Sequence, residues 1–147
     1  MIEPLRFSFE VRAAADHVFT TWTERIGSWW PPDHTVSGSP ASVVLEGRIG
    51  GRIYERSPQG DVHEWGVVTA WHPPEVLGYR WHLGVGPAHA TDVVVTFRPI
   101  DGGTTLVEIE QSGWERLGDA ATDVQDRNRA GWESLVPHFR TAVEEGA

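Results

Sequence analysis

The chain has 147 residues, 39% of them hydrophobic and 22% charged, which suits one globular domain over residues 1–147 with a sizeable core. Its net charge is −9 and its 12 basic residues are all arginine, so no nucleic-acid partner and no attachment to an anionic membrane are expected. The absence of cysteine excludes disulfides, thiolate metal sites and cysteine nucleophiles.

The N-terminal part of the chain predicts one strand followed by two short helices. Apolar and polar side chains alternate over Leu5–Val11, which is the period of a half-buried strand. Asp16 is placed to cap the first helix and Thr23 to cap the second. The Pro31-Pro32 pair ends the second helix, because proline cannot continue a helix interior.

The middle of the chain predicts strands joined by short turns, which gives an antiparallel sheet. Gly50-Gly51 predicts a bulge or bend that curves this sheet, and Asp101-Gly102-Gly103 predicts a tight hairpin turn. The expected strands are Ser42–Glu46, Arg52–Arg56, Val62–Trp71, Val76–Leu83, Thr91–Arg98 and Thr104–Gln111.

The C-terminal segment predicts a long amphipathic helix. It is expected to begin between Asp119 and Thr122, where Thr122 and Gln125 have the spacing of a capping box. Pro137 removes one backbone hydrogen bond and predicts a kink. The apolar stripe consists of Trp132, Leu135, Val136, Phe139, Ala142 and Val143.

Together these elements predict an α+β fold, in which a curved antiparallel sheet wraps around one long C-terminal helix, with two short helices after the first strand. A single helix is narrow and a sheet of six or seven strands is wide. We therefore expect a gap between them, which either bulky side chains or a ligand would fill.

The order of several short motifs resembles the START-like, or SRPBCC, superfamily, which has the birch-pollen-allergen-like helix-grip fold. It is most similar to the branch named after the C-terminal domain of the heat-shock-protein-90 ATPase activator. This resemblance implies functions as varied as carriers of hydrophobic molecules, polyketide cyclases, hormone receptors and chaperone activators. The motifs are Trp29-Trp30, Gly50-Gly51, Gly66-Val67-Val68, Trp71-His72-Pro73-Pro74, Leu77, Trp81, Gly102-Gly103-Thr104, Gln111-Ser112-Gly113-Trp114 and Gly131-Trp132.

Two positions depart from the family pattern. Gln111 stands where the family often has histidine, and Pro137 interrupts a helix that is usually regular. Both departures bear on any cavity chemistry that the resemblance implies.

The eight tryptophans predict either a bulky core or a cavity with aromatic walls. Four of them, Trp30, Trp65, Trp81 and Trp132, come from different elements that should converge between the sheet and the long helix. Ligand pockets are mostly apolar with a few polar groups, which these residues could supply, but a packed core would use the same rings. We favour a cavity because one narrow helix on a wide sheet leaves a gap and because the family resemblance implies one. The candidate lining residues are Trp30, Ile53, Tyr54, Glu55, His63, Trp65, Trp81, Val95, Gln111, Trp132, Val136 and Phe139.

Catalytic motifs are not found in the sequence. It holds neither the paired-histidine motif of zinc proteases nor a G-x-S-x-G nucleophile elbow, and Ser112 is interpreted as a turn residue. His63, His82 and His89 could form a metal triad, but we interpret them as surface or core-edge histidines. We therefore expect no metal, no cofactor and no catalytic residue. If Glu55 faces the cavity, burial should raise its pKa and make it an acid or a cation ligand.

Three functions remain as hypotheses. The preferred one is a non-enzymatic domain that binds a small hydrophobic or aromatic molecule, as a monomer or homodimer. The second is a cyclase or hydrolase that acts on an aromatic or polyketide-like substrate through Glu55, His63 or His82. The third, from the resemblance alone, is a chaperone-interacting module. Short apolar runs and a charged N-terminal segment predict a cytoplasmic protein without a signal peptide or membrane insertion.

Overall fold

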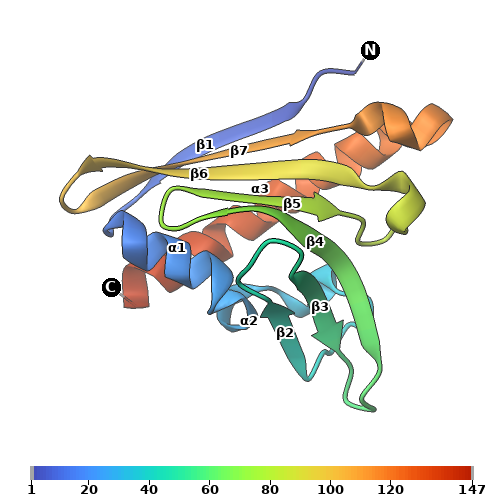
Figure 1. The fold of residues 1–147 in the computed structure, drawn as a ribbon, viewed down its shortest axis with the longest axis horizontal. Helices are drawn as coiled ribbons and strands as arrows, with labels where there is room; N and C mark the ends of the chain where they lie inside the picture. The colour runs from blue at the N-terminus through green and yellow to red at the C-terminus, as the bar shows by residue number, and fades with distance from the viewer. Residues whose placement is uncertain (1, 147) are drawn as a thin grey trace.

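The computed structural model describes residues 2–146, and Figure 1 shows its elements. The strands are β1 (Leu5–Val11), β2 (Ser42–Leu45), β3 (Arg52–Arg56), β4 (Val62–His72), β5 (Val76–Trp81), β6 (Thr91–Asp101) and β7 (Thr104–Ser112). The α-helices are α1 (Ala15–Thr23), α2 (Ile26–Trp29) and α3 (Ala121–Gly146). Short 3-10 helices cover Pro32–His34, Pro87–His89 and Trp114–Ala120.

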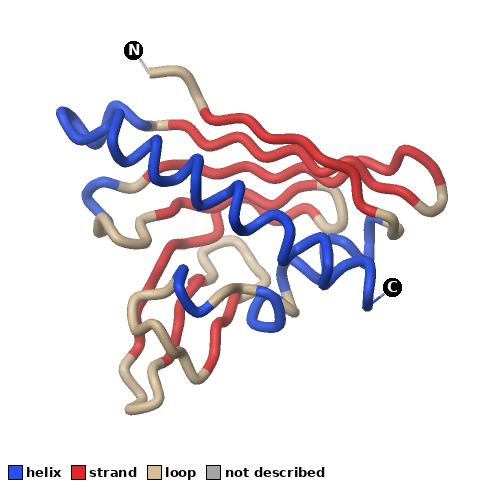
Figure 2. Tube along the Cα trace, turned by 180° about the vertical axis from the view of Figure 1, so that it is seen from behind, coloured by secondary structure: helices blue, strands red, loops and turns tan. Residues whose placement is uncertain are grey.

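The seven strands form one antiparallel sheet in the order β1-β7-β6-β5-β4-β3-β2. The register shifts between Ile53 and Tyr54 in the β3–β4 pair and between Val68 and Ala70 in the β4–β5 pair. Such bulges bend and twist a sheet, and the β2–β3 end turns away from the plane of the other strands (Figure 1). Helix α3 crosses one face of the sheet (Figure 2). The predicted α+β helix-grip fold is confirmed.

Gly50-Gly51 forms the turn that leads into β3, and the bulge itself lies at Ile53 and Tyr54. Gly50 has a φ of 83°, and a Cβ on Gly51 would lie 2.3 Å from the carbonyl oxygen of Glu46. The backbone here approaches itself so closely that only glycine fits. Strand β5 ends at Trp81 and not at the expected Leu83, because the chain turns through His82–Gly86 toward β6.

The two predicted N-caps are wrong. Helix α1 begins at Ala15, which is buried, so Asp16 lies inside the first turn, where its Oδ1 accepts a hydrogen bond from His17 N (2.8 Å). Thr23 ends α1 and donates its hydroxyl to the carbonyl of Phe19 (2.8 Å). The N-cap position of α1 is Ala14, and no side chain caps the helix there.

Helix α3 begins within the expected range but without the predicted capping box. The Trp114–Ala120 3-10 helix leads directly into it, and Gln125 Nε2 donates to the carbonyl of Glu3 (2.6 Å). The side chain of Gln125 thus serves a tertiary contact. The helix continues through Pro137 to Gly146; the kink at Pro137 stays a prediction.

One half of the space between helix and sheet is filled by an aromatic cluster. Trp22 lies at its centre, with ring centroids 4.8 Å from Phe139, 5.4 Å from Trp29 and 6.1 Å from Phe97. All four side chains are buried. These contacts join α1, α2, α3 and β6 and fill this end of the interior with side chains. Over residues 2–146, no helix is both long and apolar enough to cross a bilayer.

Candidate functional site

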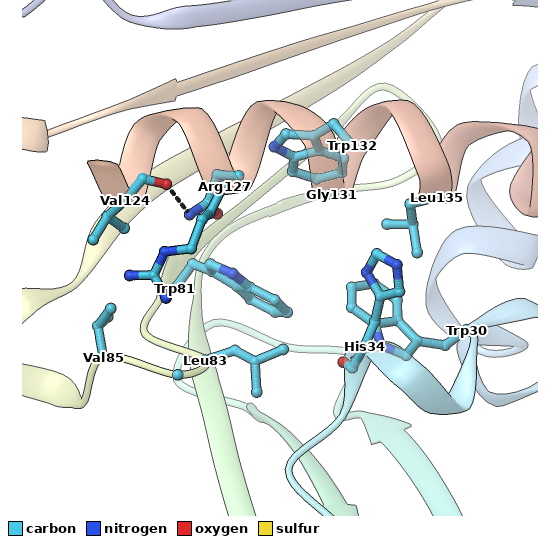
Figure 3. Close-up of a pocket in the computed structure, with 12 residues that line it drawn as sticks. Trp30, His34, Trp81, Leu83, Val85, Val124, Arg127, Gly131, Trp132 and Leu135 are labelled. Carbon is cyan, nitrogen blue, oxygen red and sulfur yellow. Dashed lines mark hydrogen bonds between the residues drawn. The ribbon is translucent and has the colours of Figure 1, made fainter. Parts of the chain in front are cut away.

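The other half of the interior contains a pocket of about 190 Å³, between the first half of α3, the end of β5 and the loop after it (Figure 3). Helix α3 packs against α1, α2 and β1, and so leaves space above β5. The lining residues are Trp30, His34, Trp81, Leu83, Gly84, Val85, Val124, Arg127, Asn128, Gly131, Trp132 and Leu135.

One wall of the pocket is a face of α3, and the spacing of its residues along the sequence explains why they lie together. Val124, Asn128, Gly131 and Leu135 recur every three or four residues, so they share one face of α3. A Cβ on Gly131 would meet only the Cε1 atom of His34, at 3.9 Å. The missing side chain at this position leaves open space beneath the helix.

The opposite wall is aromatic. Trp30 follows α2 in an extended conformation (φ −70°, ψ 120°), as expected for a residue that precedes proline, and its ring turns toward the sheet. The ring centroid of Trp30 lies 5.6 Å from that of Trp81 and 5.1 Å from that of Trp65. Trp65 is fully buried behind the other two, so it supports the wall without reaching the pocket.

Gln111 fixes the position of two lining residues. Its Oε1 accepts a hydrogen bond from Trp132 Nε1 (2.8 Å), and its Nε2 donates to Thr91 Oγ1 (2.8 Å) and Asn128 Oδ1 (3.3 Å). Asn128 Nδ2 in turn donates to the carbonyl of Val124 (2.8 Å). Gln111 is 1% exposed. This buried network holds the Trp132 ring and the Asn128 amide in one orientation.

Glu55 is fully buried but does not face the pocket. It accepts hydrogen bonds from Trp65 Nε1 (2.9 Å), Ser37 Oγ (2.7 Å), Ser37 N (3.1 Å) and Val36 N. Burial by itself raises the pKa of Glu55, yet the four donors together hold that pKa below its usual value. The raised pKa was expected only for a carboxylate that faces the cavity, and Glu55 does not meet this condition. Its carboxylate instead anchors the loop before β2 to β3 and is stabilised as an anion.

The histidines do not converge. His82 is buried and its Nε2 lies 3.1 Å from Glu64 Oε2, whereas His63 is half-buried and stands opposite Glu55 in the strand register. Among residues 2–146, no three histidine, aspartate or glutamate side chains are grouped to hold a metal ion. The histidine that lines the pocket is His34.

Comparison with known proteins identifies the family. The model of the family described as activator of Hsp90 ATPase homolog 1-like protein matches residues 12–144. The chain belongs to this family. The resemblance predicted from the motif order is thereby confirmed. No match was found among curated proteins.

Several solved structures are similar to this family member. An anthrahydroquino-γ-pyrone synthase, Txn09, is 32% identical over 84% of this chain and 85% of its own, with a TM-score of 0.61. The self-sacrificing resistance protein CalC from Micromonospora echinospora is 26% identical over 99% of this chain and 96% of its own, with a TM-score of 0.76. The Aha1 dimer from Colwellia psychrerythraea is 14% identical over 97% of both chains, with a TM-score of 0.70, and shows the shared fold alone.

The structure sorts the candidate lining residues into three groups. Trp30, Trp81 and Trp132 line the pocket. Trp65, Gln111 and Glu55 lie behind it and act through ring contacts or hydrogen bonds. Outside it lie Ile53, Val95 and Phe139, which are buried in the core, and Tyr54, His63 and Val136, which are half-buried.

Sequence reasoning missed most of the helical and loop walls. Leu135 belongs to the predicted apolar stripe of α3, and continuing from it toward the N-terminus at helical spacing would have found Gly131, Asn128 and Val124. His34, Leu83, Gly84 and Val85 lie in irregular segments, where no periodicity indicates which way a side chain points. Arg127 was missed because it lies on the part of α3 before the predicted apolar stripe.

Proposed function

We propose that this protein binds a small, mainly aromatic molecule in the pocket between α3 and the sheet. The proposal rests on one observation: the indole rings of Trp30, Trp81 and Trp132 line a preformed pocket at one end of the interior. The other end is filled by packed aromatic side chains. An engineered apolar cavity of about 150 Å³ binds benzene. The pocket of about 190 Å³ therefore suits one or two fused rings, with further parts of a ligand extending out of its mouth.

The relatives support this ligand class. The 32% identical relative is a synthase of an anthrahydroquino-γ-pyrone and was solved in a complex. The 26% identical relative is a resistance protein of the same fold over nearly its whole length. The product named for the synthase is a fused aromatic system, and such a ligand fits the flat indole walls here.

Blocking the pocket tests the proposal. Gly131→Leu places a side chain in the open space beneath α3, where only His34 lies near, and should abolish binding. Ser134→Leu adds the same side chain to the exposed face of the same helix and serves as the matched control. The measurement is a tryptophan fluorescence titration with naphthalene and anthraquinone derivatives and with a fatty acid, because Trp81 is half-exposed at the pocket.

The proposal predicts saturable quenching by the aromatic probes in the wild type and in Ser134→Leu, and none in Gly131→Leu. No saturable response to any probe would overturn it. Equal binding by Gly131→Leu and wild type would show that the probes bind elsewhere, which also overturns it.

A cyclase-type enzyme acting in the same pocket is the second candidate, favoured by the synthase relative. Of the residues first considered for this chemistry, Glu55 is fully engaged in hydrogen bonds and His82 pairs with Glu64 outside the pocket. His34 is the titratable side chain that an acid–base step would use there. Turnover of a polyketide-like substrate by the wild type, lost in His34→Ala with binding retained, would establish this alternative.

The chaperone-interacting alternative is supported by the family description alone. A test is co-purification of the chain with heat-shock protein 90, together with the ATPase rate of the chaperone. Absence of both a complex and a rate change would remove this alternative.

A further inference from the structure

The charge of the pocket is opposite to the charge of the chain. The protein has 21 acidic residues and a net charge of −9, yet none of the residues that line the pocket is acidic. The lining instead includes the guanidinium of Arg127. The imidazole of His34 also lines the pocket, and its Nε2 lies 3.9 Å from Asp33 Oδ1. A guanidinium in the lining favours a ligand of negative charge.

Arg127 has no partner of its own. Across residues 2–146, no ion pair and no side-chain hydrogen bond of Arg127 is observed within the bonding distances, although Asp123 and Asp126 belong to the same helix. Six other arginines each pair with a carboxylate: Arg6, Arg12, Arg48, Arg80, Arg98 and Arg116. The remaining arginines do not line the pocket. Arg127 thus combines a free guanidinium with a place at the pocket.

The position of Arg127 relative to the rings sets the geometry of a ligand. In Figure 3 its side chain descends from α3 at the Val85 end of the pocket, and His34 lies at the opposite end beside Trp30. The Trp81 ring lies between these two ends. A flat molecule stacked along Trp81 would therefore present one edge to the guanidinium.

We infer that the ligand is an aromatic oxyanion, a ring system with an ionised carboxylate or similar planar anionic group, held by Arg127 at the mouth of the pocket. This inference rests on the proposed function and specifies its ligand. A guanidinium matches a planar oxyanion with two parallel hydrogen bonds and stacks well on aromatic faces. The same charge disfavours amines, so neutral and cationic ring systems of equal size should bind more weakly.

A matched pair of probes separates the charge from the ring. 2-Naphthoate and 2-naphthamide have the same shape and differ in charge, and both have the two rings that suit the pocket. At low ionic strength the wild type should bind 2-naphthoate about tenfold more tightly, the effect of one exposed charge-assisted hydrogen-bond pair. Added salt should reduce this preference, because Arg127 is exposed.

Two substitutions on α3 locate the effect. Arg127→Gln should weaken 2-naphthoate binding about tenfold and leave 2-naphthamide binding within about twofold. Arg129→Gln removes the same charge from the same helix at an exposed position outside the pocket, and should keep the preference. Circular dichroism and thermal unfolding confirm that both variants are folded.

The outcomes distinguish this inference from the proposed function. Equal affinities for the two probes in the wild type, or a preference that survives in Arg127→Gln, would overturn the oxyanion inference and leave the aromatic pocket standing. Loss of the preference in Arg129→Gln would attribute it to net charge and would also overturn the inference. If neither probe binds, both the inference and the proposed function fail.

Discussion

Glu55 shows how one buried side chain can connect a loop to the sheet. Its carboxylate accepts hydrogen bonds from Val36, Ser37 and Trp65, so the segment before β2, the strand β3 and the Trp65 indole all meet at this group. A buried anion of this kind is tolerated because each of its two oxygens accepts hydrogen bonds from protein donors. The Trp65 ring that it positions then supports Trp30 and Trp81 at the pocket.

Glu55→Gln should lower the free energy of unfolding by about 2–3 kcal/mol at pH 7. The reason is that the NH₂ group of glutamine cannot accept hydrogen bonds, so N–H and O–H donors that the carboxylate now satisfies would lose their acceptor. The folded pKa of Glu55 is below its unfolded value. The stabilisation of the fold by the ionised Glu55 is therefore complete above the pKa that Glu55 has in the unfolded chain. It is lost as the pH falls through the pKa that Glu55 has in the folded chain. Urea unfolding of the wild type and Glu55→Gln at several pH values below 5 should show that the difference between their free energies of unfolding shrinks as the pH falls.

Glu133→Gln is the control for that series, since Glu133 is exposed on α3. It should leave the free energy of unfolding nearly unchanged at every pH. A gap between wild type and Glu55→Gln that stays constant down to pH 3 would contradict the assignment of the carboxylate as a buried anion.

Gln111 both accepts and donates hydrogen bonds inside the core, and a histidine at this position can be compared with it directly. Gln111→Leu should cost about 2–3 kcal/mol, because the Nε1 of buried Trp132 loses its acceptor and Thr91 loses its donor. Gln111→His can still accept from the indole with one ring nitrogen and donate with the other. Urea unfolding should therefore rank wild type, then Gln111→His, then Gln111→Leu. The reverse order of the two variants would show that volume matters more than hydrogen bonding here.

The residue scale also shows the limits of a sequence pattern. Alternation with Ile53 on β3 indicated that Glu55 could point inward, and it does. The sign of its pKa shift depended on Val36 and Ser37, which lie 18 and more residues earlier in a segment without periodicity. Alternation gives the direction of a side chain, but it does not give its hydrogen-bond partners.

Among the elements, α3 has an interior glycine whose cost can be measured. Gly131→Ala should raise the free energy of unfolding by about 0.5–1 kcal/mol, because alanine favours the helix and its Cβ meets only an ordinary contact at 3.9 Å. Gly66→Ala on β4 should do the opposite and cost about 2–3 kcal/mol, since its Cβ would lie 2.1 Å from the carbonyl oxygen of Arg80. Thermal unfolding of both variants tests the pair. Destabilisation by Gly131→Ala would show that α3 is strained at this turn.

The strands and the long helix were predictable from sequence, because apolar side chains recur along them with the period of the element and so indicate which face is buried. β1 and β3 have the predicted bounds, and Val107, Ile109 and Gln111 of β7 face inward as their alternation indicates. Helix starts were not predictable in this way. A polar residue such as Asp16 is a possible cap at many positions, and α1 begins one residue earlier, at Ala15, without a capping side chain.

At the scale of the whole molecule, some tryptophans pack the core and others line the pocket, so both interpretations of the tryptophan-rich composition hold. Trp22 and Trp29 fill the interior at the C-terminal half of α3, whereas Trp30 and Trp81 wall the pocket at its N-terminal half. Trp132 lines the pocket and lies 6.1 Å from Trp22 between ring centroids, so it joins the two halves. No sequence pattern separates these roles, because the division depends on where one narrow helix crosses a curved sheet.

Occupancy of the pocket should stabilise the whole fold, because the walls of the pocket come together only in the folded chain. A ligand that binds only the folded chain stabilises it by about 2.7 kcal/mol at one hundred times its Kd. For a chain of 147 residues this is a rise of about 5–10 °C in Tm. Differential scanning calorimetry with an aromatic probe should show this rise in the wild type and in Ser134→Leu, and no rise in Gly131→Leu. A rise of equal size in Gly131→Leu would mean that the stabilising site lies outside the pocket.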